Sequence, residues 1–170
     1  DNLINGYGLT WNTTERVQAF TNPLWLFTVA CIYFISGEIY YTAILLSWAV
    51  SVLAVFLVLA RNAGDWRTAL VGALLFACSK AFVDYSTSGL ENPLTHLLLA
   101  LFIWSYLDRP QALFRLALLA GLATLNRMDI ALLYLPTLVW VWCPHRNLRA
   151  AATLSLGFAP FALWELFSIF

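Results

Sequence analysis

The sequence predicts an all-α protein, a polytopic transmembrane helix bundle with about six transmembrane helices and one juxtamembrane or re-entrant helix. Of its 170 residues, 62% are hydrophobic and 11% are charged, whereas a typical soluble domain has roughly 25% charged residues. Too few polar groups remain to cover a water-facing surface. The apolar residues also fall in long runs that brief polar segments separate, as expected for helices that cross a bilayer.

Six apolar runs are predicted to cross the membrane. A spanning helix takes about 20 apolar residues, and shorter helices need neighbouring helices around them. The runs at 39–60 and 150–170 have this full length. The four shorter runs lie at 68–83, 94–107, 113–126 and 130–143.

A further apolar run, at 24–35, ends after only twelve residues because Ser36, Gly37 and Glu38 interrupt it. At 1.5 Å per residue it is too short to cross, so we predict an interfacial or re-entrant helix. The chain then divides into residues 1–38, an extracytoplasmic loop with a juxtamembrane helix, and residues 39–170, a single membrane domain. Because Asp1 follows no initiator Met or signal peptide, we expect a fragment of a larger protein.

The basic residues predict how the helices are oriented. Six of the nine lie in alternate hairpins, and cytoplasmic loops concentrate Lys and Arg. These six are Arg61, Arg67, Arg109, Arg115, Arg146 and Arg149. The opposite, extracytoplasmic side receives seven of the nine acidic residues, which are Asp1, Glu15, Glu38, Asp84, Glu91, Asp129 and Glu165.

Composition also narrows the partners and cofactors. No run of Lys or Arg could neutralise a phosphate backbone, so nucleic acid is not an expected partner, whereas the lipid bilayer is. Cys31, Cys78 and Cys143 lie far apart in apolar runs and predict neither disulfides nor a zinc site. No metal site is predicted, although a divalent cation is left open as a cofactor.

Two short turns on the extracytoplasmic side contain the candidate functional residues. In the turn at 85–93, Glu91 either takes part in the chemistry or only favours the positive end of the next helix dipole. In the turn at 126–129, Arg127 has either a structural role, in which it pairs with Asp129 or extends to the membrane surface, or a functional one. In the functional role it binds a substrate phosphate, with Arg16 or Lys80 as a second cation. Asp129 could also cap the helix that follows.

Smaller features receive structural interpretations. Asn22-Pro23 and Asn92-Pro93 each combine an Asn that can cap a helix with a Pro suited to its first turn. Lys80, one turn from Asp84 in an apolar helix, is expected to extend its amine to the membrane surface. His96 is expected to be a hydrogen-bonded packing residue and not a metal ligand.

Three segments resemble a known family: NGYGLTWN at 5–12, ERVQAFTNPLW at 15–25 and TSGLENP at 87–93. They are similar to the C-type superfamily of membrane glycosyltransferases, and more narrowly to the bacterial arabinofuranosyltransferase and mannosyltransferase-like proteins. The resemblance implies a module of seven transmembrane helices in the bacterial inner membrane, with its active site facing the exterior. Relative to that module, this chain is expected to lack the first transmembrane helix.

The resemblance also implies a reaction. A sugar passes, with inversion, from a polyprenyl-phosphate donor to a glycan, lipid or protein acceptor, and an Asp of an acidic pair after the first helix is the general base. That pair would precede Asp1, so Glu91 is the candidate catalytic residue within this chain. The expected substrate-binding residues are Glu15, Arg16, Asn22, Glu91, Arg127 and Asp129.

Two other classes of protein fit the same features. In a transporter or flippase fragment, the acidic residues would form a substrate or proton pathway, which requires charges near the middle of the bilayer. Nearly all charges here are predicted at helix ends, which favours the enzyme. A purely structural membrane subunit is the third possibility, and the polar, aromatic first segment argues against it.

Overall fold

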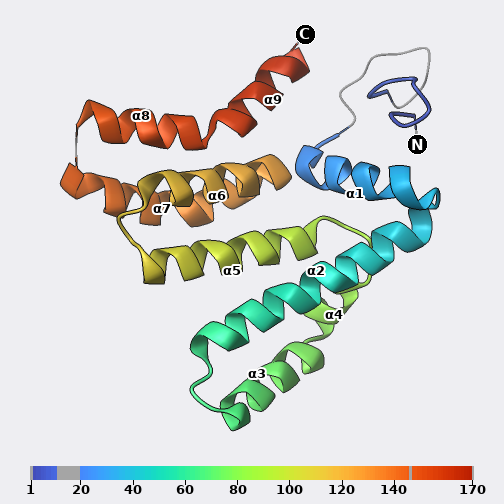
Figure 1. Ribbon diagram of the computed structural model, residues 1–170, viewed down its shortest axis with the longest axis horizontal. Helices are drawn as coiled ribbons and strands as arrows, with labels where there is room; N and C mark the ends of the chain where they lie inside the picture. Colours follow the sequence, from blue (N-terminus) through green and yellow to red (C-terminus); the bar gives the residue numbers. More distant parts are fainter. Residues whose placement is uncertain (1, 11–19, 146, 170) are drawn as a thin grey trace.

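The computed structural model describes residues 2–10, 20–145 and 147–169, and within them every regular element is a helix (Figure 1). This confirms the predicted all-α class. The elements are α1 (Pro23–Ser36), α2 (Ile39–Asn62), α3 (Trp66–Cys78), α4 (Lys80–Ser86), α5 (Asn92–Asp108), α6 (Leu113–Asn126), the 3-10 turn η1 (Met128–Ile130), α7 (Ala131–Trp142), the 3-10 turn η2 (Cys143–His145), α8 (Leu148–Gly157) and α9 (Ala159–Ile169).

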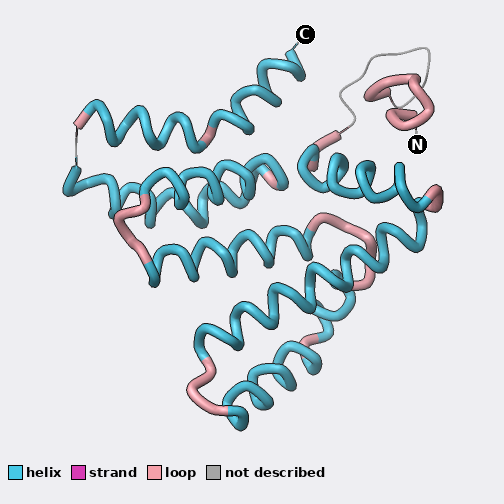
Figure 2. The backbone as a smooth tube through the Cα atoms, in the orientation of Figure 1, coloured by secondary structure: helices cyan, strands magenta, loops and turns pink. Residues whose placement is uncertain are grey.

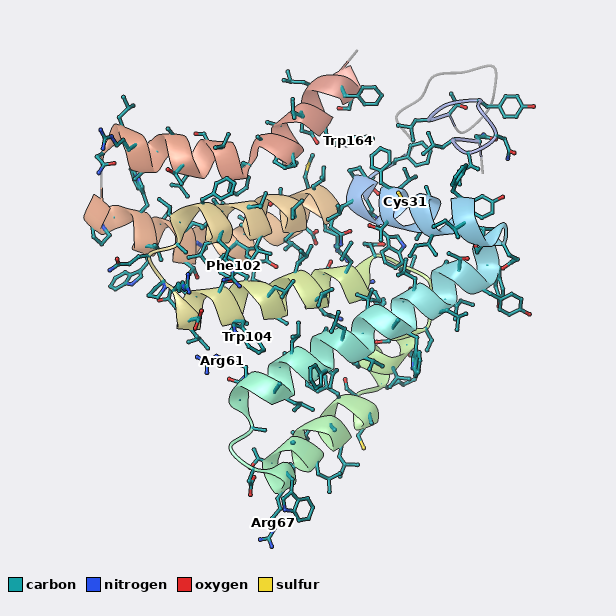
Figure 3. All side chains as sticks on the ribbon, in the orientation of Figure 1. Cys31, Arg61, Arg67, Phe102, Trp104 and Trp164 are labelled. Carbon is teal, nitrogen blue, oxygen red and sulfur yellow. The ribbon has the colours of Figure 1, made fainter. Side chains whose placement is uncertain are left out.

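The helices run back and forth, so that their connections gather on two sides of the fold (Figure 2). The last residues of α2, α5 and α7 lie on one side, at the left in Figure 1. The last residues of α4 and α6 lie on the other side, near the start of α1. The turns at 87–91 and 127–130 therefore share one end of the bundle, while Arg61 and Arg67 lie at the other (Figure 3).

By length and composition, α2 is the one described helix that could cross a membrane unaided. Up to three crossings result if the bent pairs α3–α4 and α8–α9 are each counted as one. The predicted six-span bundle is therefore not confirmed. The prediction of single helices at 68–83 and 150–170 is wrong, because α3 and α4 meet at 75° and α8 and α9 at 57°.

Local chemistry explains both bends. Ser79 accepts a hydrogen bond from the backbone N–H of Phe82 and so caps α4, an alternative to continuing the helix that serine side chains favour. At the second bend, α8 ends at Gly157, and Pro160 follows at the second position of α9. Proline is tolerated in a first turn but disrupts a helix interior, so the two elements cannot form one straight helix.

Helix starts differ from the predicted pattern at both Asn-Pro pairs. Asn22 precedes α1 but makes no capping hydrogen bond. Asn92 is the first residue of α5, and Glu91 occupies the position before it. The predicted asparagine caps are therefore wrong at these two sites, and the Asn92 side chain makes a different contact, which is described with the functional site.

The core lies where α5, α6 and α7 meet. α6 is its central element, since Leu116, Ala117, Ala120 and Ala123 have no exposed surface. Across this core the ring of Phe102, labelled in Figure 3, meets the ring of Tyr134 edge to face, with centroids 4.8 Å apart. By contrast, α2 and α3 leave large apolar side chains exposed, which is consistent with contact to lipid or to other protein segments.

The backbones of α6 and α8 touch. A Cβ added to Gly121 would lie 2.6 Å from the carbonyl oxygen of Gly157, and a Cβ on Gly157 would lie 2.7 Å from the backbone carbon of Ala117. Small residues allow such close approach between helices in membranes. Because Gly157 is also the last residue of α8, this contact fixes the point from which α9 departs.

We expect Gly157→Ala to lower the stability of the protein by about 1–3 kcal/mol, because the methyl group would meet backbone atoms that cannot move aside. The thermal midpoint of the detergent-solubilised protein, followed by circular dichroism, measures the effect. Gly64→Ala is the matched control, since a Cβ there meets nothing within 4 Å. Equal midpoints for the two variants would contradict the close approach.

Candidate functional site

A cavity of about 580 Å³ opens at the end of the bundle where the turns at 87–91 and 127–130 meet α1 and α9. We call it the charged cavity. It is lined by Phe20, Thr21, Asn22, Pro23, Glu91, Thr124, Leu125, Arg127, Met128, Asp129, Phe161, Trp164 and Glu165. Four predicted substrate-binding residues, Asn22, Glu91, Arg127 and Asp129, are thus brought together, whereas Glu15 and Arg16 lie outside the described residues.

Arg127 joins the two turns. Its Nε and Nη2 donate to the two carboxylate oxygens of Asp129, at 3.1 and 2.8 Å, and its Nη1 donates to Oδ1 of Asn92 at 2.9 Å. Nη1 also lies 3.5 Å from Oε1 of Glu91. The predicted pairing of Arg127 with Asp129 is therefore confirmed, and the guanidinium additionally holds the start of α5.

This arrangement leaves part of the guanidinium for a ligand. Arginine has five N–H donors; three are used in these hydrogen bonds, and a fourth faces Glu91. The Arg127 side chain keeps 33% of its surface exposed, whereas that of Glu91 keeps 13%. One N–H of Nη2 thus has no partner among the described residues, and Arg127 lines the charged cavity.

Charge pairing stabilises the ionised forms of both partners. The hydrogen bond from Arg127 lowers the pKa of the Asp129 carboxyl, and the bond to Asp129 raises the pKa of the guanidinium. Asp129 is exposed to solvent on one side, so the pair contributes modestly to stability. Its main consequence is geometric, because two parallel hydrogen bonds fix the plane of the guanidinium.

The side chain of Asn126 links the same two turns on their buried side. Its side chain is fully buried, and its Nδ2 donates to the carbonyl oxygen of Glu91 at 3.1 Å and to the hydroxyl oxygen of Thr95 at 2.9 Å. The last residue of α6 is thereby tied to the first turn of α5. Sequence reasoning missed this residue, because a single Asn at a helix end gives no sign that its partners are 31 and 35 residues away.

A second cavity, of about 540 Å³, adjoins the first. It is enclosed by residues 2–10, α1 and the start of α2. We call it the apolar cavity, since most of its wall is hydrophobic side chains such as Leu9, Leu26 and Val29. Phe20, Thr21 and Asn22 line both cavities. Its wall is fastened to the turn at 87–91 by Trp25, whose indole N–H donates to the carbonyl oxygen of Gly89 at 3.0 Å.

Two residues weighed from the sequence lie away from this site. Lys80 forms an exposed ion pair with Asp84, at 2.5 Å, so it does not serve as a second cation beside Arg127. The ring of His96 stacks on that of Phe82 with centroids 5.3 Å apart. His96 is therefore a packing residue as predicted, but its buried Nδ1 has no hydrogen-bond partner among the described residues.

α9 contributes residues that sequence reasoning did not assign to the site. Phe161, Trp164 and Glu165 line the charged cavity with the i, i+3, i+4 spacing of one helix face. The acid and the tryptophan within one apolar run were the available signal. Their proximity to Arg127 depends on the bend between α8 and α9, which was not predicted although Pro160 is a local signal for it.

Comparison with known proteins gives one informative match. The chain is 27% identical, over 184 aligned residues, to a terminal beta-(1->2)-arabinofuranosyltransferase of Mycobacterium tuberculosis. The alignment covers 95% of this chain but only 29% of the relative's length. No family model and no solved structure matches the chain. The relative is an enzyme of the kind that the sequence motifs resemble, and the alignment with it extends over nearly the whole chain.

We expect Asn126→Ala to destabilise the protein by about 1–3 kcal/mol, because the buried Thr95 hydroxyl would lose its donor and α6 would lose its side-chain bonds to the first turn of α5. Chemical unfolding of the detergent-solubilised protein measures the change. Asn62→Ala is the control, since Asn62 is exposed and its side chain bonds to the carbonyl oxygen of Val58 in its own helix. If Asn126→Ala were as stable as the control, the hydrogen bonds from Asn126 to α5 would not contribute to the free energy of unfolding.

Proposed function

We propose that the charged cavity belongs to the active site of a membrane glycosyltransferase. The enzyme would move a sugar from a polyprenyl-phosphate donor to an extracytoplasmic glycan, lipid or protein acceptor, with inversion at the anomeric carbon. The observation that carries this proposal is the position of Arg127, fixed on the cavity wall by Asp129, Asn92 and Glu91 with an N–H left for a ligand. The 27% identity to an arabinofuranosyltransferase supports sugar transfer as the reaction.

Arg127 would bind the donor phosphate. In the reaction, the acceptor oxygen attacks the anomeric carbon, the bond from that carbon to the phosphate oxygen breaks, and the negative charge collects on the departing polyprenyl phosphate. A preorganised cation at that position stabilises the developing charge without reorganising. Because three carboxylates also line the cavity, we propose Arg16, close in sequence to Asn22, as the second cation.

The apolar cavity would hold the first part of the polyprenyl chain. It adjoins the charged cavity along Phe20, Thr21 and Asn22, so a molecule with a charged head and an apolar tail can occupy both. An apolar lining with few polar groups suits a hydrocarbon chain. This shape supports a lipid-linked donor over a free sugar nucleotide.

Glu91 is better assigned as a positioning residue than as the base. Its carboxylate faces the Arg127 guanidinium and its side chain is 13% exposed, so it mainly orients that guanidinium. The general base would then be the acidic pair that the family resemblance places before Asp1. Within the described residues no group of three or more Asp, Glu, His or Cys side chains could hold a metal ion.

The proposed location is a bacterial inner membrane that the chain crosses several times, with the charged cavity facing the periplasm. The positions of two arginines at one end of the bundle support this orientation. Arg61 and Arg67 lie at the end of the bundle away from the two acidic turns (Figure 3), and cytoplasmic loops are enriched in such residues. The donor lipid would then reach the cavity from the outer leaflet.

We expect Arg127→Lys to reduce kcat/KM for the donor about 100-fold or more, because lysine cannot form the paired bonds to Asp129 or hold the phosphate in the same plane. The assay follows transfer from polyprenyl-phosphate arabinofuranose to an octyl arabinofuranoside disaccharide, using the protein encoded by the complete gene. Arg67→Lys, at the far end of the bundle, is the matched control.

Two results would count against the proposal. Unchanged turnover in Arg127→Lys would remove the phosphate assignment. Transbilayer flux of the lipid-linked sugar in proteoliposomes, with no transfer by the wild-type protein, would instead favour a flippase.

A further inference from the structure

α9 forms a distinct wall of the charged cavity. Its residues Trp164 and Glu165 line the cavity together with Arg127, yet they come from the last element of the chain. Figure 3 shows Trp164 where α9 approaches α1. The ring of Trp164 meets that of Phe27 edge to face at 5.8 Å, so the indole is held between the two helices.

The carboxylate of Glu165 has no counter-ion and no hydrogen-bond donor among the described residues. Only its backbone oxygen takes part in a side-chain contact, accepting from the hydroxyl of Ser168. The residue is half-buried, so its charge is partly removed from water. An ionised carboxylate only accepts hydrogen bonds, and a ligand that satisfies it must therefore offer N–H or O–H groups.

The nature of that ligand follows from the neighbouring groups. A phosphate would be repelled by a carboxylate that has no counter-ion among the described residues, and Arg127 already offers a site for one elsewhere in the cavity. A neutral sugar has hydroxyl donors for Glu165 and an apolar C–H face that can lie against an indole ring. Tryptophan supplies a large, rigid apolar surface of this kind.

We infer that Trp164 and Glu165 form the subsite for the neutral acceptor sugar. The donor phosphate lies at Arg127, and its hydrocarbon chain extends toward the apolar cavity, which leaves the α9 wall for the acceptor. This inference rests on the proposed glycosyltransferase function and adds the residues that recognise its second substrate. Glu165 accepts hydrogen bonds from acceptor hydroxyls, and Trp164 packs against the sugar ring.

Binding of an octyl arabinofuranoside disaccharide to the full protein in nanodiscs tests the subsite directly, by saturation-transfer NMR titration. Glu165→Gln should weaken binding about 10-fold or more, since hydrogen bonds to a charged group are stronger than those to a neutral one. Trp164→Ala should also weaken it at least 10-fold. Binding of the polyprenyl-phosphate donor should stay within about twofold of wild type in both variants, a range well below the tenfold expected for a lost direct contact.

Asp108→Asn and Trp140→Ala are the matched controls, because Asp108 and Trp140 are exposed and do not line the charged cavity. Both should bind the disaccharide as the wild type does. Their use separates the subsite from any general effect of removing a carboxylate or an indole.

A series of single-deoxy disaccharides distinguishes recognition from a structural role. The wild-type protein should bind at least one deoxy analogue much more weakly than the parent, because its carboxylate would lose a donor. In Glu165→Gln this difference should largely disappear. The inference would be overturned if Glu165→Gln weakened the binding of the parent disaccharide and of every deoxy analogue by the same factor. Wild-type affinity in Glu165→Gln would also overturn it, and so would failure of the wild type to bind the disaccharide.

The two proposals can fail separately. If the wild type transfers sugar while the Glu165 and Trp164 variants bind the disaccharide normally, the acceptor subsite is wrong and the proposed function stands. If binding depends on these residues but no transfer occurs with any polyprenyl-phosphate donor, Trp164 and Glu165 still form a sugar-binding site, while the proposed function and the acceptor role are wrong.

Discussion

The guanidinium of Arg127 is the contact on which the described site depends. It bonds to Asp129 in its own turn and to Asn92 at the start of α5, and it faces Glu91. Asn126 reinforces the same junction from the buried side. Two turns that are about 35 residues apart in the sequence thereby become one wall, on which α1 and α9 close the charged cavity. The functional proposals require this junction, because it places a cation at a fixed position and orientation.

The apolar runs and the polar segments between them were enough to locate the helices. Every predicted apolar run contains a helix. The short run at 24–35 is α1, and Gly37 follows its last residue in the left-handed conformation that glycine permits. The two bends were not foreseen. Ser79 lies inside an apolar run, and its cap is visible only once the backbone has turned. At the second bend, Gly157 and Pro160 are a local signal that the prediction of a single helix at 150–170 overlooked.

The candidate site was predicted in part. Polar residues at helix ends on one side of the chain pointed to Asn22, Glu91, Arg127 and Asp129, and these four line one cavity. The contact between Arg127 and Asn92 was not predictable, because it depends on the packing of α5 against α6. Trp164 and Glu165 were missed for a similar reason: they reach the cavity only because α9 bends away from α8. The roles of Glu15 and Arg16 stay predictions.

The central claim is that the turns at 87–91 and 127–130 form one site in a single aqueous compartment outside the membrane. Substituted-cysteine labelling in whole cells tests it most directly, after Cys31, Cys78 and Cys143 are replaced by serine. A membrane-impermeant maleimide should label Ser88→Cys and Met128→Cys in intact cells, and Gln111→Cys, between α5 and α6, only after permeabilisation. Labelling of positions 88 and 128 from opposite sides of the membrane would contradict the account.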